Sequence, residues 1–335
     1  MANKDNQECC EKFKTMIGGQ ALIEGIMMRG PQKDAIVCRT KEGVKVEVSD
    51  RKIPGEKSPW RWPLLRGVYN FFDSQVTGVK ALLRSADLSP DEGDMPEEPS
   101  KLDLWLEKKL GNEKFQQVVI AVAVAMGLGL SVLLFFLLPM VIGGFFDGFV
   151  KSNVGINLIE GLVRMVIFVC YIVMISRMGE MKRLFSYHGA EHKTIRCYEA
   201  GLTLTVENVR PQTRLHPRCG TSFLLVVMIL SILVFSVASS ALLSLVPALE
   251  AMRGSILYRL IMIVFKLLLL PLVVAISYEI NRWVGRYDNW LTRIVTAPGM
   301  WFQNFTTNEP DDSMIEVAIM AVEAVLPENE GDDKW

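Results

Sequence analysis

The chain has 335 residues, of which half are hydrophobic and 22% are charged, and its mean hydropathy is +0.26. A positive mean hydropathy at this length is unusual for a water-soluble protein and indicates membrane spans. The 36 lysines and arginines nearly balance the 37 aspartates and glutamates, which argues against a basic nucleic-acid-binding protein, so we expect no nucleic-acid partner. The six cysteines contain no C-x-x-C pair, which predicts reduced thiols rather than a disulfide framework.

The first part of the chain is predicted to lie outside the membrane. Residues 1–16 are charged and predict a flexible N-terminus without an apolar signal-peptide core. Residues 17–62 alternate and turn like strands, most clearly where DAIVCRT and VKVEVSD form a β-hairpin. Residues 63–88 predict an amphipathic helix, which either lies at the membrane interface or packs on the hairpin. Residues 89–116 predict an acidic, proline-rich linker followed by a helix.

Residues 117–281 hold four apolar stretches, each long enough to cross a bilayer, for which about 20 residues suffice. The first begins near Val118 and exceeds one span, so we expect Pro139 and the Gly143-Gly144 pair to break it and leave a re-entrant or interfacial tail. The other three occupy residues 155–176, 222–249 and 255–280. Residues 282–335 predict a C-terminal tail that carries an aromatic stretch and a final helix.

The basic residues predict the orientation. Fifteen lysines and arginines flank the spans before the first, after the second and after the fourth, whereas only Lys151 and Arg253 lie in the other two loops. Since basic residues stay on the cytosolic side, both termini and the loop 177–221 are predicted to be cytosolic. The predicted fold class is a mainly α integral membrane protein, with four transmembrane helices and a small N-terminal cytosolic β-hairpin region. Its predicted location is the plasma membrane.

All three histidines of the chain fall within 29 residues of the middle loop. His188 and His192 belong to an H-x-x-E-H sequence around Glu191. If that segment is helical, positions i and i+4 share one face, so both imidazoles can reach one ion. The same spacing is found in inverzincins, where the glutamate assists hydrolysis.

The third histidine begins the sequence His216-Pro217-Arg218-Cys219-Gly220, which has the form of a zinc knuckle with histidine in place of the first cysteine. His188, His192, His216 and Cys219 therefore form a candidate tetrahedral site with three nitrogens and one sulfur. Imidazole and thiolate suit zinc, which is the predicted metal cofactor.

Two alternatives stay open at this site. H-x-x-E-H often arises by chance, and loop histidines are usually solvated. If a metal is bound, four protein ligands would close the site and make it structural, whereas three would leave it open for catalysis, with Glu191 as the candidate catalytic base. Glu279, at the end of the fourth span, is interpreted as a helix-end carboxylate rather than a ligand.

Besides Glu279, four charged residues interrupt the predicted spans. Glu160 and Arg164 stand four residues apart and are expected to pair on one helix face. Lys266 lies near the middle of the fourth span, with Arg259 toward its outer end. Because an unpaired charge at that depth costs several kcal/mol, Lys266 is a candidate for binding a headgroup or for an ion pair.

Five separated motifs occur in order along the chain, and together they resemble the bacterial YqhQ-like family. They are GGQALIEGIMMRGP, SYHGAEHKTIRCYE, RLHPRCGTSF, SYEINRW and TTNEPDDSMIEVAIMA. The resemblance implies an integral protein of the bacterial cell membrane, described as a predicted metal-dependent enzyme of uncharacterised function. It places the metal site in the HGAEH segment and carries over to His188, Glu191, His192, His216 and Cys219.

Three functions follow as hypotheses. The first is a metal-dependent hydrolase at the cytosolic face, with a peptide or a lipid-linked ester as substrate. The second is a non-enzymatic scaffold or biogenesis factor with a structural metal, which would hold a membrane-protein partner or a second copy of the chain against the bilayer. The third is a transporter component, suggested by the charges within the spans.

Overall fold

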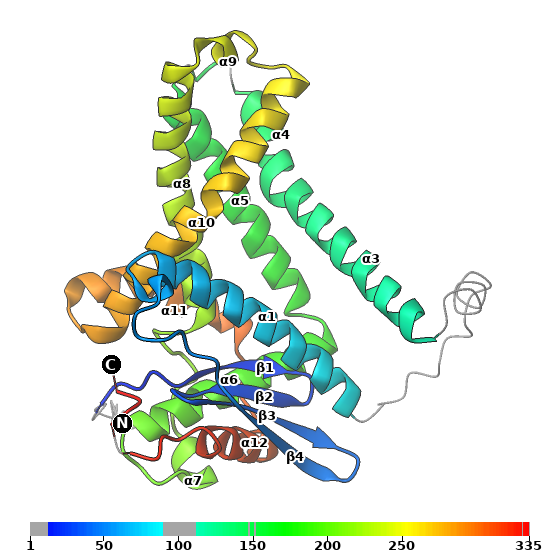
Figure 1. Ribbon diagram of the computed structural model, residues 1–335, viewed down its shortest axis with the longest axis vertical. Helices are drawn as coiled ribbons and strands as arrows, with labels where there is room; N and C mark the ends of the chain where they lie inside the picture. Colours follow the sequence, from blue (N-terminus) through cyan, green and yellow to red (C-terminus); the bar gives the residue numbers. More distant parts are fainter. Residues whose placement is uncertain (1–12, 90–111, 147, 151, 330, 335) are drawn as a thin grey trace, which may run out of the picture. The chain divides into compact units, whose positions relative to one another are not determined.

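The computed structural model describes residues 13–89 and 112–334 apart from positions 147, 151 and 330. Most of the predicted linker and most of the predicted flexible N-terminus lie outside these ranges. The chain divides into two compact units, one formed by residues 1–90, 171–230 and 270–335 and the other by residues 91–170 and 231–269. We call them the site unit and the membrane unit. Figure 1 shows their elements in chain order.

The site unit contains a four-stranded antiparallel sheet in the order β1-β2-β3-β4. Its strands are β1 (Gly18–Leu22), β2 (Gly25–Arg29), β3 (Lys33–Thr40) and β4 (Gly43–Asp50). The predicted hairpin is confirmed as β3 and β4, in which Val37 pairs with Val46. The preceding glycine-rich segment adds β1 and β2 to it, so the β region is a sheet rather than one hairpin.

Helices cover both faces of this sheet, as Figure 1 shows. On one side α6 (Gly179–Glu199) and α12 (Asp312–Glu323) pack against Ile26 and Met28, and on the other α1 (Leu65–Leu88) packs against Met27. Side chains alternate between the faces of a strand, so burial on both sides makes β2 almost entirely apolar. The site unit also contains a 3-10 turn (Pro59–Arg61), the short α7 (Val206–Val209) and α11 (Trp290–Thr306).

The predicted amphipathic helix is α1. Its Gly67 lies so close to α10 (Ile256–Arg286) that an added Cβ would come within 3.1 Å of the Ala275 Cα. Arg66 of α1 forms an ion pair with Glu279 of α10, which lies seven residues before the end of that helix rather than at its end. Together these contacts fix α1 across the final turns of an apolar helix.

Four helices are long and apolar enough to cross a membrane, which agrees with the four predicted spans and makes the chain a multipass membrane protein. They are Ala121–Gly144, Val154–Ile175, Gly220–Leu245 and Ile256–Arg286. The corresponding elements are α3 (Asn112–Val132) with α4 (Leu138–Gly144), α5 (Asn153–Ile175), α8 (Gly220–Leu245) and α10. A short α9 (Pro247–Ala251) follows α8.

The predicted break of the first span at Pro139 is wrong. A π-helical turn, Leu133–Leu137, joins α3 to α4, and the Leu138 amide donates to the Leu133 carbonyl. Pro139 follows this turn at the start of α4, where its missing N–H costs no helical hydrogen bond, so the helix continues to Gly144. The helix does end at the Gly143-Gly144 pair, as the sequence predicts, and a Cβ on Gly143 would come within 2.9 Å of Glu160 Cγ.

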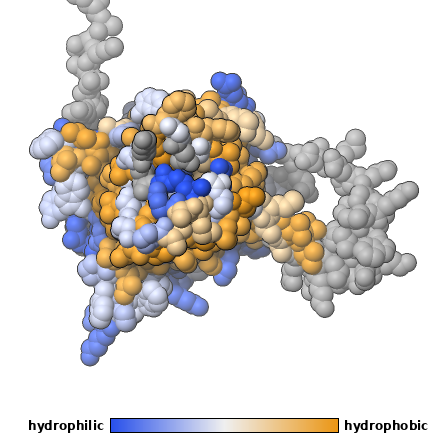
Figure 2. All heavy atoms as spheres, turned by 90° about the horizontal axis from the view of Figure 1, so that it is seen from above, coloured by the Kyte–Doolittle hydropathy of each residue, from blue (hydrophilic) through white to orange (hydrophobic). Residues whose placement is uncertain are grey.

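The charges of the membrane unit bind one another. Lys266 donates to Glu160 in a buried ion pair, and Arg164 donates to the Phe135 carbonyl (2.7 Å) and to the Ser231 hydroxyl (3.4 Å). The partner of Glu160 is therefore Lys266 of α10 rather than the expected Arg164 of its own helix. Figure 2, seen from above Figure 1, shows hydrophilic atoms gathered in the middle of a largely hydrophobic surface.

Candidate metal centre

The H-x-x-E-H sequence lies in the middle of α6, within the part of the chain predicted as a loop. Its helix places His188 and His192 one turn apart, with ring centroids separated by 4.4 Å. Gly189 between them lies against the segment before α12, where an added Cβ would be 2.0 Å from the Asn308 carbonyl oxygen. Glycine at this position therefore lets the other segment approach the helix closely, which explains one residue of the motif.

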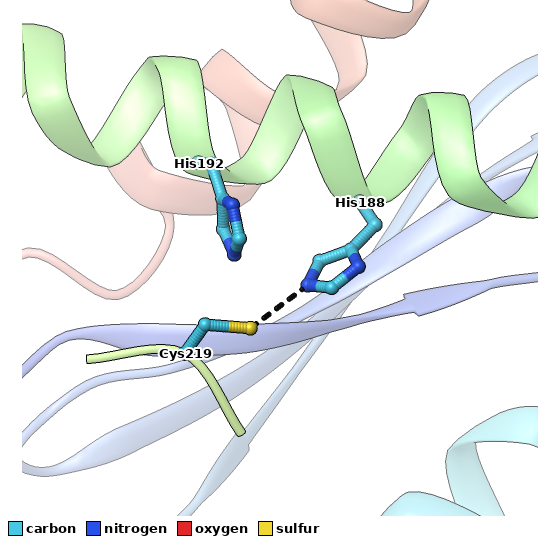
Figure 3. A group of neighbouring side chains, drawn as sticks. All are labelled: His188, His192 and Cys219. Carbon is cyan, nitrogen blue, oxygen red and sulfur yellow. Dashed lines mark hydrogen bonds between the residues drawn. The ribbon is translucent and has the colours of Figure 1, made fainter. Parts of the chain in front are cut away.

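Cys219 completes the cluster from the turn that precedes α8. Its sulfur lies 3.2 Å from His188 Nε2, and the potential ligand atoms of His188, His192 and Cys219 all lie within 4.8 Å of one another. Figure 3 shows both imidazoles descending from α6 toward the sulfur. Two nitrogens and one sulfur converge here from positions 31 residues apart, so the predicted ligands from both ends of the loop meet.

Backbone carbonyls fix both imidazoles from behind. His188 Nδ1 lies 2.8 Å from the Thr306 carbonyl oxygen, and His192 Nδ1 lies 2.6 Å from that of Arg214. A carbonyl can only accept, so each Nδ1 must carry a proton, which makes Nε2 the nitrogen through which each ring can bind a cation. His192 Nε2 is buried and has no hydrogen-bond partner among the residues that the structure describes.

Electrostatics favour a thiolate at Cys219. Burial by itself raises the pKa of this thiol, but the electrostatic interactions with His188 and then with His192 outweigh burial and bring the pKa well below its usual value. For His188, burial acts to lower the pKa, yet the facing Cys219 raises it to about 9. The pair is thus held as imidazolium and thiolate, and a cation that replaced the proton would find an ionised sulfur ligand.

Glu191 is buried beside the cluster. Its Oε1 accepts a hydrogen bond of 2.9 Å from the Gly19 amide, whereas its Oε2 has no partner among the described residues. Burial raises the pKa of this carboxyl. A Cβ on Gly19 would lie 3.2 Å from Glu191 Cδ, so this glycine of the N-terminal motif leaves room for the carboxylate. One oxygen is therefore positioned by the backbone while the other remains available.

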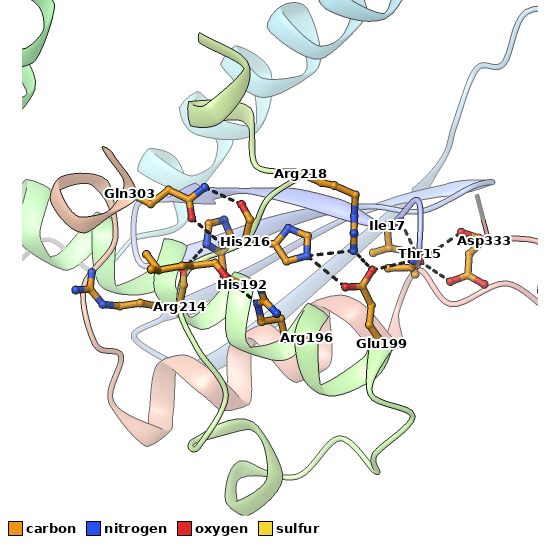
Figure 4. A network of polar contacts seen from close by, with 11 residues as sticks. Thr15, Ile17, His192, Arg196, Glu199, Arg214, His216, Arg218, Gln303 and Asp333 are labelled. Carbon is orange, nitrogen blue, oxygen red and sulfur yellow. Dashed lines mark hydrogen bonds and ion pairs between the residues drawn. The ribbon is translucent and has the colours of Figure 1, made fainter. Parts of the chain in front are cut away.

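The third histidine lies next to the cluster but faces a different partner. The ring of His216 is 5.6 Å from that of His192, and its Nε2 is 3.3 Å from Glu199 Oε2. Gln303 binds both its backbone amide and its carbonyl at 2.7 Å. Figure 4 shows His216 in this network, in which Arg218 also binds Glu199. The structure therefore brings together three of the four predicted ligands and places His216 in an adjoining network.

Glu199 extends this network to the segment that precedes β1. It accepts from the Thr15 amide at 2.8 Å, and the Thr15 hydroxyl donates to Asp333 at 2.5 Å. Burial raises the pKa of Glu199, whereas the Arg218 guanidinium opposes that rise. The network joins α6 to segments from both ends of the chain and so supports the wall of the site. Sequence reasoning did not identify Glu199, Thr15 or Gln303. Thr15 lies 184 residues from Glu199 and Gln303 lies 87 residues from His216, and no local pattern links Glu199 to His216, which is 17 residues away.

The N-terminal motif contributes two further contacts near the site. Glu24 forms an ion pair with Arg183 on α6 and accepts from the Tyr187 hydroxyl at 3.2 Å. Arg29 forms ion pairs with Asp34 and Asp73. These residues attach the sheet to α6 and α1.

Comparison with known proteins places the chain in a family. Residues 62–328 match the family described as a protein of unknown function, DUF1385. The chain is also 31% identical over 324 residues to the uncharacterised protein YqhQ of Bacillus subtilis strain 168, covering 94% of this chain and 93% of that protein. The chain belongs to the DUF1385 family. No solved structure matches it significantly.

Proposed function

We propose that this member of the DUF1385 family is a membrane-bound, metal-dependent hydrolase whose metal is held by His188, His192 and Cys219. The observation that carries the proposal is the pair of backbone carbonyls behind the imidazoles, which orient both rings so that Nε2 is the nitrogen that can bind a cation in the cluster. Backbone or carboxylate acceptors behind ligating histidines are usual in metal sites. The buried Nε2 of His192 otherwise has no partner among the described residues.

Zinc suits this donor set best, since it accepts nitrogen and sulfur ligands in tetrahedral sites. When bound, it would supply Lewis-acid chemistry and lower the pKa of a water molecule. With His216 turned to Glu199, three protein ligands leave one tetrahedral position available, which is the arrangement of catalytic rather than structural zinc sites.

The roles of the neighbouring residues follow from their contacts. Glu191 would act as the general base through Oε2, because the Gly19 amide positions its other oxygen. His216 would shape the site through the Glu199 network instead of binding the metal. The distribution of basic residues supports a cytosolic location for this site and for both termini.

The test begins with the metal and needs no known substrate. Full-length protein purified in an uncharged detergent is expected to hold one equivalent of zinc by mass spectrometry, and Cys219→Ser to hold at most a tenth as much. Cobalt substitution is expected to give a sulfur-to-cobalt charge-transfer band that Cys219→Ser removes and His216→Gln preserves. Protein without bound metal, or loss of the band in His216→Gln with the fold intact, would contradict the assignment.

Glu191→Gln separates an enzyme from a scaffold. It is expected to retain the metal but to lose hydrolysis of ester or peptide libraries presented in vesicles, because the amide cannot accept the proton. Cys170→Ser, which changes an exposed cysteine outside the cluster, is the control that keeps both properties. Full complementation of a deletion phenotype by Glu191→Gln would reject the hydrolase.

The second candidate is a scaffold with a structural metal. The cluster joins α6 to the start of α8, and the carbonyl of Thr306 attaches the end of α11, so a metal here would fasten three elements. A scaffold predicts that chelation releases a stoichiometric membrane-protein partner or separates two copies of the chain, and that Glu191→Gln does neither. The available ligand position favours the hydrolase.

A further inference from the structure

A polar cavity of about 260 Å³ adjoins the metal centre within the site unit. Its lining includes three residues of the metal centre and three polar residues of the sheet and α1, namely His192, Glu191, Cys219, Arg29, Arg51 and Ser74. The lining also includes Gly18, where an added Cβ would meet no atom within 4 Å. The cavity approaches the lower limit of ordinary ligand pockets, which run from about 300 Å³. It has room for a small polar group beside the cluster rather than for a long chain.

Arg51 is the arginine of this cavity that lacks an acidic partner among the described residues. Its Nη1 donates to the Gly30 carbonyl at 3.1 Å, which orients the guanidinium and leaves Nε and Nη2 available. Arg29 nearby is already bound to Asp34 and Asp73. Burial, and then the charge of Arg29, lower the pKa of Arg51. An anion bound here would relieve both unfavourable effects, since guanidinium matches phosphate and carboxylate with paired hydrogen bonds.

The cavity also lies at the end of a membrane span. Gly220, which belongs to its lining, is the first residue of α8 and of the span Gly220–Leu245. The ends of spans lie at the depth of the lipid headgroups. On α1, which contributes Ser74 to the lining, Phe72 and Val76 are more than half exposed, which is typical of a helix that lies in a membrane interface.

We propose that this cavity binds the phosphate group of a membrane lipid, with the Arg51 guanidinium as its principal ligand and the headgroup beside the metal cluster. The proposal rests on the proposed function, because it names the substrate class of that site. Phosphate is the anionic group that phospholipids present at the depth where span ends lie, which favours it over a peptide carboxylate. The bond to be hydrolysed would then belong to a phosphorylated or lipid-linked headgroup.

The experiment measures lipid binding by the full-length, zinc-loaded protein in an uncharged detergent. The probe is dihexanoylphosphatidylglycerol, followed by isothermal titration calorimetry. Arg51→Gln is expected to weaken its affinity at least tenfold, and Arg51→Lys to weaken it less, because lysine keeps the charge but loses the paired hydrogen bonds. Dihexanoylglycerol lacks the phosphate. Its affinity for the wild-type protein is expected to be no higher than the affinity of the phospholipid for Arg51→Gln.

Arg61→Gln is the matched control, since Arg61 is exposed and lies ten residues along the same chain segment. It removes the same charge and is expected to leave the affinity within twofold of wild type. An equal loss in both variants would assign the binding to general surface charge and overturn the proposal, as would unchanged affinity in Arg51→Gln with native circular dichroism. Inorganic phosphate that binds as tightly as the phospholipid would overturn the lipid as the source of the phosphate.

Metal analysis on the same samples separates this inference from the proposed function. Arg51→Gln is expected to retain its zinc, because Arg51 is not a ligand. If wild-type protein contains no metal, the hydrolase fails, and the response of phospholipid binding to Arg51→Gln still decides whether the cavity holds a phosphate. If zinc is present and the affinity does not respond to Arg51→Gln, the metal site stands and the lipid-phosphate assignment fails.

Discussion

Two buried groups of polar residues invite comparison, one in each unit. In the membrane unit Lys266 and Glu160 are almost inaccessible and bind each other. In the site unit His192 and Glu191 are equally buried, yet each keeps one atom without a partner among the described residues. A buried group with its hydrogen bonds satisfied is complete as folded, whereas unsatisfied atoms cost free energy unless a ligand binds. The first pair therefore indicates packing, and the second group indicates binding.

The largest effect is expected from breaking the closed pair. Lys266→Met leaves Glu160 without its cation in an apolar surrounding, which should destabilise the protein by about 3–5 kcal/mol. The double variant Lys266→Met/Glu160→Gln should recover most of this loss because no charge remains buried. Reversible unfolding in detergent measures both. If the double variant proves as unstable as the single one, the pair does more than neutralise charge.

The next largest effect concerns the metal cluster of the site unit. The stability that this cluster contributes should depend on a bound ligand, whereas that of the Lys266–Glu160 pair should not. Chelation should lower the free energy of unfolding by about 2.7 kcal/mol when the free metal had been 100-fold above its Kd. In Cys219→Ser chelation should change nothing, because the metal is already absent. Thermal unfolding with and without chelator gives the comparison. Equal shifts in both proteins would mean that the metal binds elsewhere.

Gly189 tests how closely the site depends on packing around α6. Gly189→Ala places a Cβ 2.0 Å from the Asn308 carbonyl oxygen and should cost about 1–3 kcal/mol of stability, with weaker metal binding. Gly179→Ala is the matched control on the same helix, where an added Cβ meets no atom within 4 Å. Both are measured by thermal unfolding and metal titration. Because alanine favours helices more than glycine does, an unchanged or raised stability in Gly189→Ala would contradict the close contact.

The smallest effect is expected for the ion pair between Arg84 and Glu47, which is exposed to solvent, unlike the two buried groups. Hydrogen bonds from Arg84 lower the pKa of Glu47 to about 2, from an ordinary 4.5. The stabilisation of the folded protein by this ion pair is thus present above pH 4.5 and is lost as the pH falls toward 2. Because both side chains are solvated, the loss should be small. Stability of wild type and Arg84→Gln should converge between pH 5 and pH 2.5. A constant difference would contradict the pair.

Much of the architecture was predictable because it depends on local composition. Runs of more than 20 apolar residues specify spans whatever they pack against, and alternation specifies β3 and β4. The break predicted at Pro139 was wrong because the sequence does not distinguish a proline at the start of a helix from one in a helix interior. The break was avoided by the π-helical turn before it, which is a matter of backbone geometry.

The sequence by itself determined which ligand types were present and that two of them, His188 and His192, share a helix face, because a four-residue spacing fixes that geometry wherever the helix lies. Tertiary structure alone decided the rest. It brought Cys219 to these rings, turned His216 toward Glu199, and placed the carbonyls of Thr306 and Arg214 behind the imidazoles. Every residue carries the same carbonyl, so its role is set only by where the folded chain places it.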